Sequence, residues 1–327
     1  MDRLPLIFDD PMWDTHMATG LYYSERFTKH MTGFDHPERP RRVSYVREKL
    51  EETGMIHRLK EVVPLPQDTM WLYEVHGGKY IDHLRRSAHM APTFLDPDTV
   101  MCPESFEIAM LSAFSGIQAC EEVIQGRMSN AFCLTRPPGH HAERNEAMGF
   151  CFFNNAAVAA QYLRVEHGLK RVLIVDWDVH HGNGTQHIFY DTNEVFYFSV
   201  HQWPSFPGTG AADESGEGDG KGFTLNVPMK PGSGNDAWEN AFLDNLYPAI
   251  QWFEPEFIIV SAGFDAHWED PLAGQHVTDD GFQRLSELVR NLAEKYCGGR
   301  LVSILEGGYD VASLSRSIHA HLDVLIS

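Results

Sequence analysis

The feature of this sequence that most constrains its fold is the alternation of short, almost continuously apolar segments with longer segments of helical periodicity. Strands that are covered on both faces of a parallel sheet have this apolar composition. The predicted strands are residues 131–135, 171–178, 195–200, 256–262 and 300–305. The predicted helices are residues 105–125, 153–165, 236–253 and 278–296, each with a Gly or Pro near its end. This order predicts an α/β fold with one parallel sheet flanked by helices on both faces.

Length and composition favour one soluble domain over residues 1–327. The sequence contains no repeat, no low-complexity tract and no Ser/Pro-rich linker. No apolar run is long enough to cross a bilayer, and the first residues, MDRLPLIFDDPMWD, lack the features of a signal peptide. We therefore expect a cytoplasmic protein with no membrane contact. The five cysteines form no C-x-x-C pair, so we expect buried free thiols.

The charge of the chain restricts its partners. It carries 26 Lys+Arg and 46 Asp+Glu, which gives a net charge of −20. Such a chain is repelled by a phosphate backbone, and we expect no nucleic-acid binding. The acidity favours cationic partners or serves solubility alone.

The run VDWDVHHGNG at 175–184 predicts a metal site. On an extended chain, Asp176, Asp178 and His180 share one face at the carboxyl end of a strand, where α/β sheets bind ligands. Asp265 follows a second apolar strand and would complete an O,N,O set with a position open to water and a substrate carbonyl. His267 is an alternative ligand or a residue of the rim.

Two further turns carry groups suited to catalysis. RPPGHHA at 136–142 is a rigid turn that presents His140 and His141, which are either catalytic or merely solvated. Asp176 is the natural partner for one histidine, and Asn183 for the other. The turn LEGGYD presents Tyr309, whose phenol either donates to an oxyanion or only closes the turn.

Several loops are candidates for the rim of a site. Phe150 and Phe206 either wall a channel for an alkyl chain or belong to the core. The non-periodic stretch 14–42, with His16, has functional potential because long ordered loops are usually functional. The stretch 208–222 fits neither a phosphate loop nor a calcium loop, and we expect a flexible surface loop.

Taken together, these motifs resemble those of the zinc-dependent histone deacetylase and acetylpolyamine amidohydrolase superfamily. The matching motifs are RPPGHH, DxDxHHGNG, SxGFDAH and LEGGY, in this order. The resemblance extends from about Asp14 to Tyr309. It implies a single arginase-like α/β domain with an eight-stranded parallel sheet.

The resemblance also implies a role for each matching residue. It assigns one catalytic Zn²⁺ to three ligands, Asp178, His180 and Asp265. His141 would be the general base and acid, oriented by Asn183, with His140 held by Asp176 as an electrostatic partner. Tyr309 would polarise the amide carbonyl and stabilise the tetrahedral intermediate. The residues implied to contact substrate are Gly149, Phe150 and Phe206 in an acyl-lysine tunnel, Asp98 and Leu272 at its rim, and Gly307.

One or two structural K⁺ ions are implied as well. The first would lie beside the zinc ligands, on Asp176, Asp178, His180, Ser199 and Val200. The second would lie near Phe189, Thr192, Val195 and Phe223.

Three positions indicate the subclass and the substrate. Asn183 stands where class I enzymes have an aspartate, which resembles class II, and Tyr309 stands where weakly active class IIa members have a histidine. Leu272 stands where polyamine-specific eukaryotic members have an acidic residue, which fits acyl-lysine proteins or peptides better than acylated polyamines. An acetylpolyamine deacetylase and a non-catalytic acyl-lysine binder remain alternatives. An arginase-like enzyme would need bridging aspartates for two manganese ions. The sequence does not determine the oligomeric state, and a homo-oligomer is an open alternative.

Overall fold

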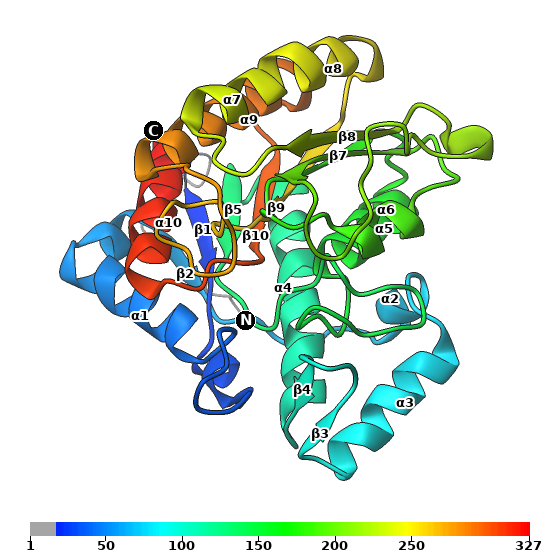
Figure 1. The fold of residues 1–327 in the computed structure, drawn as a ribbon, viewed down its shortest axis with the longest axis vertical. Helices are drawn as coiled ribbons and strands as arrows, with labels where there is room; N and C mark the ends of the chain where they lie inside the picture. Colours follow the sequence, from blue (N-terminus) through cyan, green and yellow to red (C-terminus); the bar gives the residue numbers. More distant parts are fainter. Residues whose placement is uncertain (1–17) are drawn as a thin grey trace, which may run out of the picture.

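The structure is a computed structural model and describes residues 18–327. Its centre is an eight-stranded sheet in which every neighbouring pair is parallel, in the order β2-β1-β5-β10-β9-β6-β7-β8 (Figure 1). These strands are β1 (Thr19–Tyr22), β2 (Lys60–Val62), β5 (Asn130–Cys133), β6 (Val172–Asp176), β7 (Val195–Gln202), β8 (Thr224–Met229), β9 (Phe257–Ala262) and β10 (Leu301–Leu305). A two-stranded antiparallel pair, β3 (Thr93–Phe94) and β4 (Val100–Met101), lies apart from it. The predicted single α/β domain with an eight-stranded parallel sheet is therefore confirmed.

Helices cover both faces of the sheet because alternate side chains of each central strand point to opposite faces. In β6, Leu173 and Val175 join one apolar core, whereas Val172 and Ile174 join the other. The first core is covered by α1 (Arg41–Glu52), α7 (Asn235–Ala241), α8 (Tyr247–Phe253), α9 (Asp279–Cys297) and α10 (Val311–Ile326). The second is covered by α2 (Met70–Tyr73), α3 (Gly78–His89), α4 (Ser105–Ile124) and α5 (Asn155–His167). The short α6 (Asn183–Ile188) follows β6.

Local sequence signals set the ends of the predicted helices. The Asn154 side chain caps α5 by accepting a hydrogen bond from the Ala157 N–H, and the Thr278 side chain caps α9 in the same way. Gly168 ends α5 with φ of 68°, a left-handed conformation that glycine adopts without strain. The Gly and Pro signals thus located these helices to within a few residues.

The structure also departs from the sequence-based prediction. Strands β1, β2 and β8 were not predicted, because β1 and β2 are very short and β8 has alternating burial and a proline at position 228. The predicted helix 236–253 is broken by a π-helical turn between α7 and α8. The predicted strand 171–178 ends at Asp176, two residues early.

The stretch 208–222 is more closely held than the predicted flexible loop. The Glu214 carboxylate accepts hydrogen bonds from the backbone N–H groups of Gly210 and Ala211. It also accepts one from Gln186 in α6, at 2.6 Å. These contacts fix the first half of the stretch against the helix that follows β6.

Two predictions made from composition concern the cysteines and membrane-spanning segments. All five cysteines are free and buried, as predicted. Within residues 18–327, none of the helices combines the length and the apolar composition that crossing a bilayer requires.

Candidate metal centre and active site

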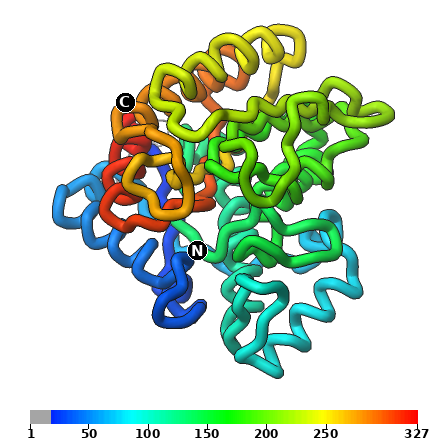
Figure 2. Tube along the Cα trace, viewed as in Figure 1, coloured from blue at the N-terminus to red at the C-terminus, as the bar shows by residue number. Residues whose placement is uncertain are grey.

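The candidate site lies at the carboxyl edge of the sheet, where four parallel strands end together. The loops that follow β5, β6, β9 and β10 meet there, although they are distant in the sequence (Figures 1 and 2). The register brings the strand ends level, since Asp176 at the end of β6 pairs with Ser261 in β9 and Ser199 in β7. Because parallel strands place their carboxyl ends at one edge, the four loops contribute to a single site.

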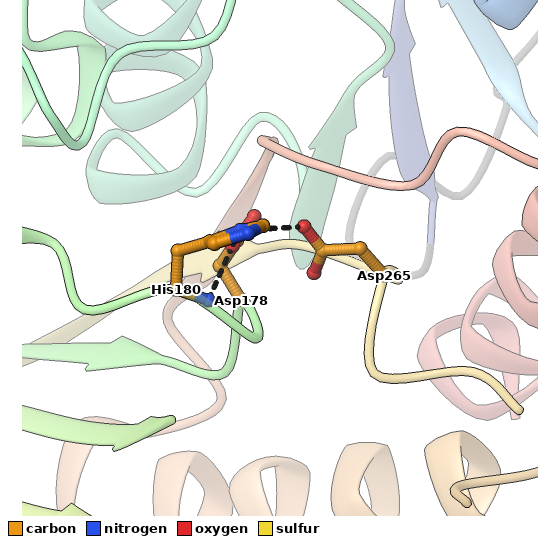
Figure 3. A group of neighbouring side chains, drawn as sticks. All are labelled: Asp178, His180 and Asp265. Atoms are coloured by element: carbon orange, nitrogen blue, oxygen red, sulfur yellow. Dashed lines mark hydrogen bonds and ion pairs between the residues drawn. The ribbon is translucent and has the colours of Figure 1, made fainter. Parts of the chain in front are cut away.

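Asp178, His180 and Asp265 converge at this edge (Figure 3). The His180 Nδ1 atom lies 3.1 Å from Asp178 Oδ1 and 3.1 Å from Asp265 Oδ2. Donor atoms bound tetrahedrally to one Zn²⁺ at about 2.0–2.1 Å are roughly 3.3 Å apart. The observed spacing of the O,N,O set therefore fits one zinc ion.

The charge at this point also fits a cation. Asp178 and Asp265 are buried and face the same histidine. Burial and the neighbouring Asp178 carboxylate raise the pKa of Asp265 to about 7. Two ionised carboxylates buried together are costly unless a cation compensates them, and a bound Zn²⁺ would do so.

Gly307 gives these carboxylates the space they occupy. A Cβ at position 307 would lie 2.1 Å from Asp265 Oδ2 and 2.5 Å from Asp178 Oδ2. The Gly307 N–H donates to Asp178 Oδ2 at 2.7 Å. Gly307, predicted as a substrate contact, thus lies behind the metal-ligand candidates and does not line the cavity described below.

The three candidate ligands are brought together by a turn after the strand. The prediction that Asp178 and His180 share one face of an extended strand was therefore wrong. The strand ends at Asp176, and the His180 N–H then bonds to Asp178 Oδ1 at 2.9 Å. The Val179 N–H reaches across to Asp265 Oδ1 at 2.8 Å. His267, the alternative ligand, lies 3.2 Å from Asp279 at the start of α9 and is outside the cluster.

The two adjacent histidines have different partners. His140 Nδ1 lies 3.0 Å from Asp176 Oδ2, which also accepts a hydrogen bond from the Tyr197 hydroxyl at 2.9 Å. Burial alone lowers the pKa of His140, but Asp176 and other nearby carboxylates raise it to about 10. His141 Nδ1 lies 2.8 Å from Asn183 Oδ1, and burial and the neighbouring histidines lower its pKa well below the ordinary value. The two rings therefore favour different protonation states.

Neighbouring residues hold Tyr309 through its backbone N–H and through its ring. The Asp270 carboxylate accepts a hydrogen bond from the Tyr309 N–H at 2.6 Å. The Arg42 guanidinium lies over the ring at 4.8 Å, and Phe150 packs against it edge-on. Within residues 18–327, no group accepts a hydrogen bond from the Tyr309 hydroxyl, which is thus available to a ligand.

His141, His180 and Tyr309 line one cavity of about 260 Å³. Its lining residues are Pro37, Asp98, His141, Gly149, Phe150, His180, Phe206, Leu272 and Tyr309. The Phe206 ring packs edge-on against His141, at 5.0 Å between centroids. At Gly149, where φ is +56°, a Cβ would lie 2.5 Å from the His141 ring. The predicted rim residues and the predicted catalytic pair His141 and Tyr309 are therefore brought to one cavity.

Four residues that support the site were missed by the sequence analysis. The buried Glu306 carboxylate accepts hydrogen bonds from the backbone of Gly139 and His140, and so fixes the turn that carries both histidines. Arg42 is buried, donates to the Gly308 carbonyl and pairs with Glu38 at 3.1 Å. Asp270 is the fourth. Glu306 lay inside the LEGGYD turn, and Glu38 and Arg42 lay inside the stretch 14–42, but no role was predicted for any of them.

The residues predicted to hold K⁺ lie in two places. Ser199 is opposite Asp176 in the register of β6 and β7, and Val200 follows it. Phe189 ends α6 and Val195 begins β7, with the Thr192 N–H 3.4 Å from the Phe189 carbonyl oxygen. The Phe223 carbonyl accepts a hydrogen bond from the Tyr197 N–H at 2.9 Å. These positions are compatible with the predicted sites, which stay predictions.

The N-terminal stretch with functional potential is described from residue 18 onward, so His16 lies outside the described residues. His30 is buried and bonds to Ser105 at 2.8 Å. His36 reaches the Asp98 carbonyl at 3.0 Å and packs against Phe150, so this stretch supports the rim of the cavity.

Comparison with known proteins identifies the family. A family model described as the histone deacetylase domain matches residues 36–325. The chain belongs to the histone deacetylase family. Because its relatives include deacetylases and amidohydrolases, this histone deacetylase family member is a hydrolase that acts on amide bonds.

Relatives of this family member are found in all three domains of life. A "Probable deacetylase" of Archaeoglobus fulgidus is 38% identical over 90% of this chain and 82% of its own length. A "Histone deacetylase-like amidohydrolase" of Pseudomonas aeruginosa is 42% identical over 85% of this chain and 73% of its own. The human "Polyamine deacetylase HDAC10" is 37% identical over 95% of this chain and 48% of its own.

The fold is shared with a solved relative. A crystal structure of the HDA15 HD domain superposes with a TM-score of 0.91 at 38% identity, covering 95% of this chain and 88% of that one. The eight-stranded sheet and its helices are thus those of the histone deacetylase fold.

Proposed function

We propose that this deacetylase removes acetyl or other acyl groups from the ε-amine of lysine, with one Zn²⁺ on Asp178, His180 and Asp265. The observation that carries the proposal is that one cavity is lined by His180 of this O,N,O set, by His141 and by Tyr309, whose hydroxyl has no partner among residues 18–327. The family membership agrees with such a centre.

The proposed chemistry divides between the metal and the side chains. When bound, Zn²⁺ lowers the pKa of a water molecule and polarises the amide carbonyl. His141 takes a proton from the attacking water at Nε2 and returns it to the leaving amine, while its Nδ1 keeps its own proton and donates a hydrogen bond to Asn183 Oδ1. Tyr309 donates its hydroxyl proton in a hydrogen bond to the carbonyl oxygen as negative charge develops there. His140, paired with Asp176, adds positive charge beside the reacting groups.

The shape of the cavity supports a substrate with a narrow aliphatic chain. Phe150 and Phe206 stand on its walls, and Gly149 leaves the space between Phe206 and His141 open. Asp98 lies at the rim, where a carboxylate can accept hydrogen bonds from the backbone of an acyl-lysine peptide. Leu272 adds an apolar rim contact without a charge to attract a polyamine.

An acetylpolyamine deacetylase is the second candidate. The net charge of −20 suits a polycation, and a human relative at 37% identity carries the name polyamine deacetylase. A side-by-side measurement of kcat/KM for acyl-lysine peptides, N-acetylputrescine and N-acetylspermidine separates the two. Higher values for the peptides support the proposal, and higher values for the polyamines replace it.

The same assay tests a non-catalytic role. Chelator-sensitive hydrolysis of any substrate in the panel is expected. A protein that holds zinc but hydrolyses none of them would instead be an acyl-lysine binder.

We also propose that one or two K⁺ ions support the strand ends at Asp176, Ser199 and Val195. The support is that several buried oxygen atoms lie beside Asp176, among them those of Ser199 and the Tyr197 hydroxyl. Elemental analysis of protein dialysed against a potassium-free buffer tests it.

A further inference from the structure

The side-chain amide of Asn183 lies between His141 and Glu143. Its oxygen Oδ1 lies 2.8 Å from His141 Nδ1. Its nitrogen Nδ2 donates to Glu143 Oε1 at 2.5 Å, and lies 3.3 Å from the His141 carbonyl oxygen and 3.3 Å from Met148 Sδ. The amide therefore has a different kind of partner at each end.

The partners of Nδ2 fix which way the amide points. An ionised carboxylate and a carbonyl oxygen only accept hydrogen bonds, so the amide must turn its NH₂ group toward Glu143 and the His141 carbonyl. The amide oxygen then necessarily faces His141 Nδ1. Since an amide oxygen only accepts, His141 Nδ1 must carry the proton, which leaves the lone pair on Nε2.

Glu143 lies outside the lining of the cavity. Its side chain is about one-fifth exposed. Its other partner is His187 Nδ1, at 2.7 Å, whose side chain is about half exposed. Its backbone N–H bonds to the Glu146 carbonyl at 2.9 Å, a contact that does not depend on its side chain.

We propose that Glu143 is a positioning residue that sets the direction of the Asn183 amide and, through it, the tautomer of His141. The inference rests on the proposed function only in taking His141 as the general base. The tautomer itself is defined whether or not the enzyme turns over.

The variant Glu143→Lys reverses the polarity at the outer end of the amide. A lysine only donates, so it favours the flipped Asn183, whose NH₂ group then faces His141 Nδ1. The proton of His141 moves to Nε2, and the base is lost from the cavity. We expect kcat to fall about 10²-fold, within the range that general acid–base catalysis contributes, with KM little changed.

Two further variants grade the effect. Glu143→Gln offers either an oxygen or an NH₂ group to Asn183, so we expect a loss of only about 10-fold in kcat. Glu146→Lys makes the same charge change on the same turn, at an exposed position with no contact to Asn183, and is the matched control. Its kcat should equal that of the wild type.

The double variant E143K/N183D supplies a rescue. A carboxylate at position 183 accepts hydrogen bonds from both sides and needs no particular direction. It restores the proton on His141 Nδ1 beside the introduced lysine. We expect the double variant to regain most of the kcat that Glu143→Lys loses.

The deciding readout is ¹⁵N NMR of the His141 imidazole in zinc-loaded protein, assigned by comparison with His141→Gln. The proposal expects the Nδ1-protonated tautomer in the wild type and in Glu146→Lys, and the Nε2-protonated one in Glu143→Lys. It is overturned by an Nε2-protonated ring in the wild type, or by an unchanged tautomer in Glu143→Lys. If Glu143→Lys does not fold, Glu143→Gln decides: the proposal expects a mixture of both His141 tautomers in this variant, and a purely Nδ1-protonated ring there would overturn it.

Failure of the proposed function gives a different result. A His141→Ala variant with wild-type kcat would remove His141 as the base. The tautomers would still report whether Glu143 sets the direction of the amide.

Discussion

The floor and the rim of the cavity differ in how firmly the fold holds them. At the floor, Asp178 and Asp265 contact the lining residue His180 and are at most 1% exposed, and each accepts a hydrogen bond from a backbone N–H of another loop. On the rim, Phe206 is 44% exposed and Leu272 is 39% exposed. Side chains built into strand ends keep their geometry, whereas exposed loop side chains change at little cost in stability. We infer that the floor determines the reaction and the rim determines the substrate.

The largest expected effect comes from the floor. Asp265→Asn removes a charged member of the O,N,O set and should lower both zinc affinity and kcat, the latter by about 10³-fold. Zinc content by elemental analysis and kcat on an acetyl-lysine peptide check it. His267→Asn is the matched control, since His267 lies two residues away but outside the cluster, and it should retain zinc. Full zinc occupancy with normal turnover in Asp265→Asn would remove this residue from the metal centre.

The second effect tests a floor residue, Tyr309, that is not a candidate metal ligand. Tyr309→Phe removes only the hydroxyl that faces the cavity, so kcat should fall about 10²-fold while zinc is retained. Tyr73→Phe, on the exposed face of α2, is the control and should behave as the wild type. Equal turnover in the two variants would mean that Tyr309 does not stabilise developing charge.

A third, smaller effect tests the rim. Leu272→Glu places a negative charge beside the cavity, where it attracts the distal amines of a polyamine. The ratio of kcat/KM for N-acetylspermidine to that for an acetyl-lysine peptide should rise about 10-fold, mostly through KM. Leu243→Glu is a close control because Leu243 is also 39% exposed but does not line the cavity. A change in kcat alone would contradict the division between floor and rim.

The smallest expected effect depends on pH. Burial and the neighbouring Asp96 raise the pKa of Asp98 to about 6. Above this pH Asp98 is ionised and accepts hydrogen bonds from a peptide, and as the pH falls through 6 it becomes protonated. We expect KM for a peptide to rise about threefold between pH 7 and pH 5.5, and this rise to be absent in Asp98→Asn. Asp236→Asn, at a fully exposed position, should keep the wild-type profile. The same rise in Asp98→Asn would assign the pH dependence to another group.

The sequence predicted the residues of the cavity floor better than the residues and strands that support them. Asp178, His180 and Asp265 follow central strands whose continuous apolar composition is easy to recognise, and these strands were located to within two residues at each end. The edge strand β2 was missed because its three residues are partly exposed and carry no such signal. The role of Arg42, at the end of the stretch 14–42, could not be predicted, because it acts on the Gly308 carbonyl, 266 positions along the chain. Contacts of this range depend on the completed fold, not on local composition.

The rim was predicted in part, and for a different reason. Phe150 and Phe206 were recognised as loop aromatics, but whether they face a cavity or the core depends on how their loops pack. Pro37 was not singled out as a lining residue, since a proline in a loop indicates only a turn. The dependence of His141 on Glu143 was equally invisible, because the two are linked through Asn183 on another loop.

The most direct test of the account is a zinc titration of the chelated protein, followed by hydrolysis of an acetyl-lysine peptide. We expect activity to be absent without metal, to rise in proportion to bound zinc and to saturate at about one ion per chain. Activity that persists in the metal-free protein, or that saturates only at two ions per chain, would contradict it.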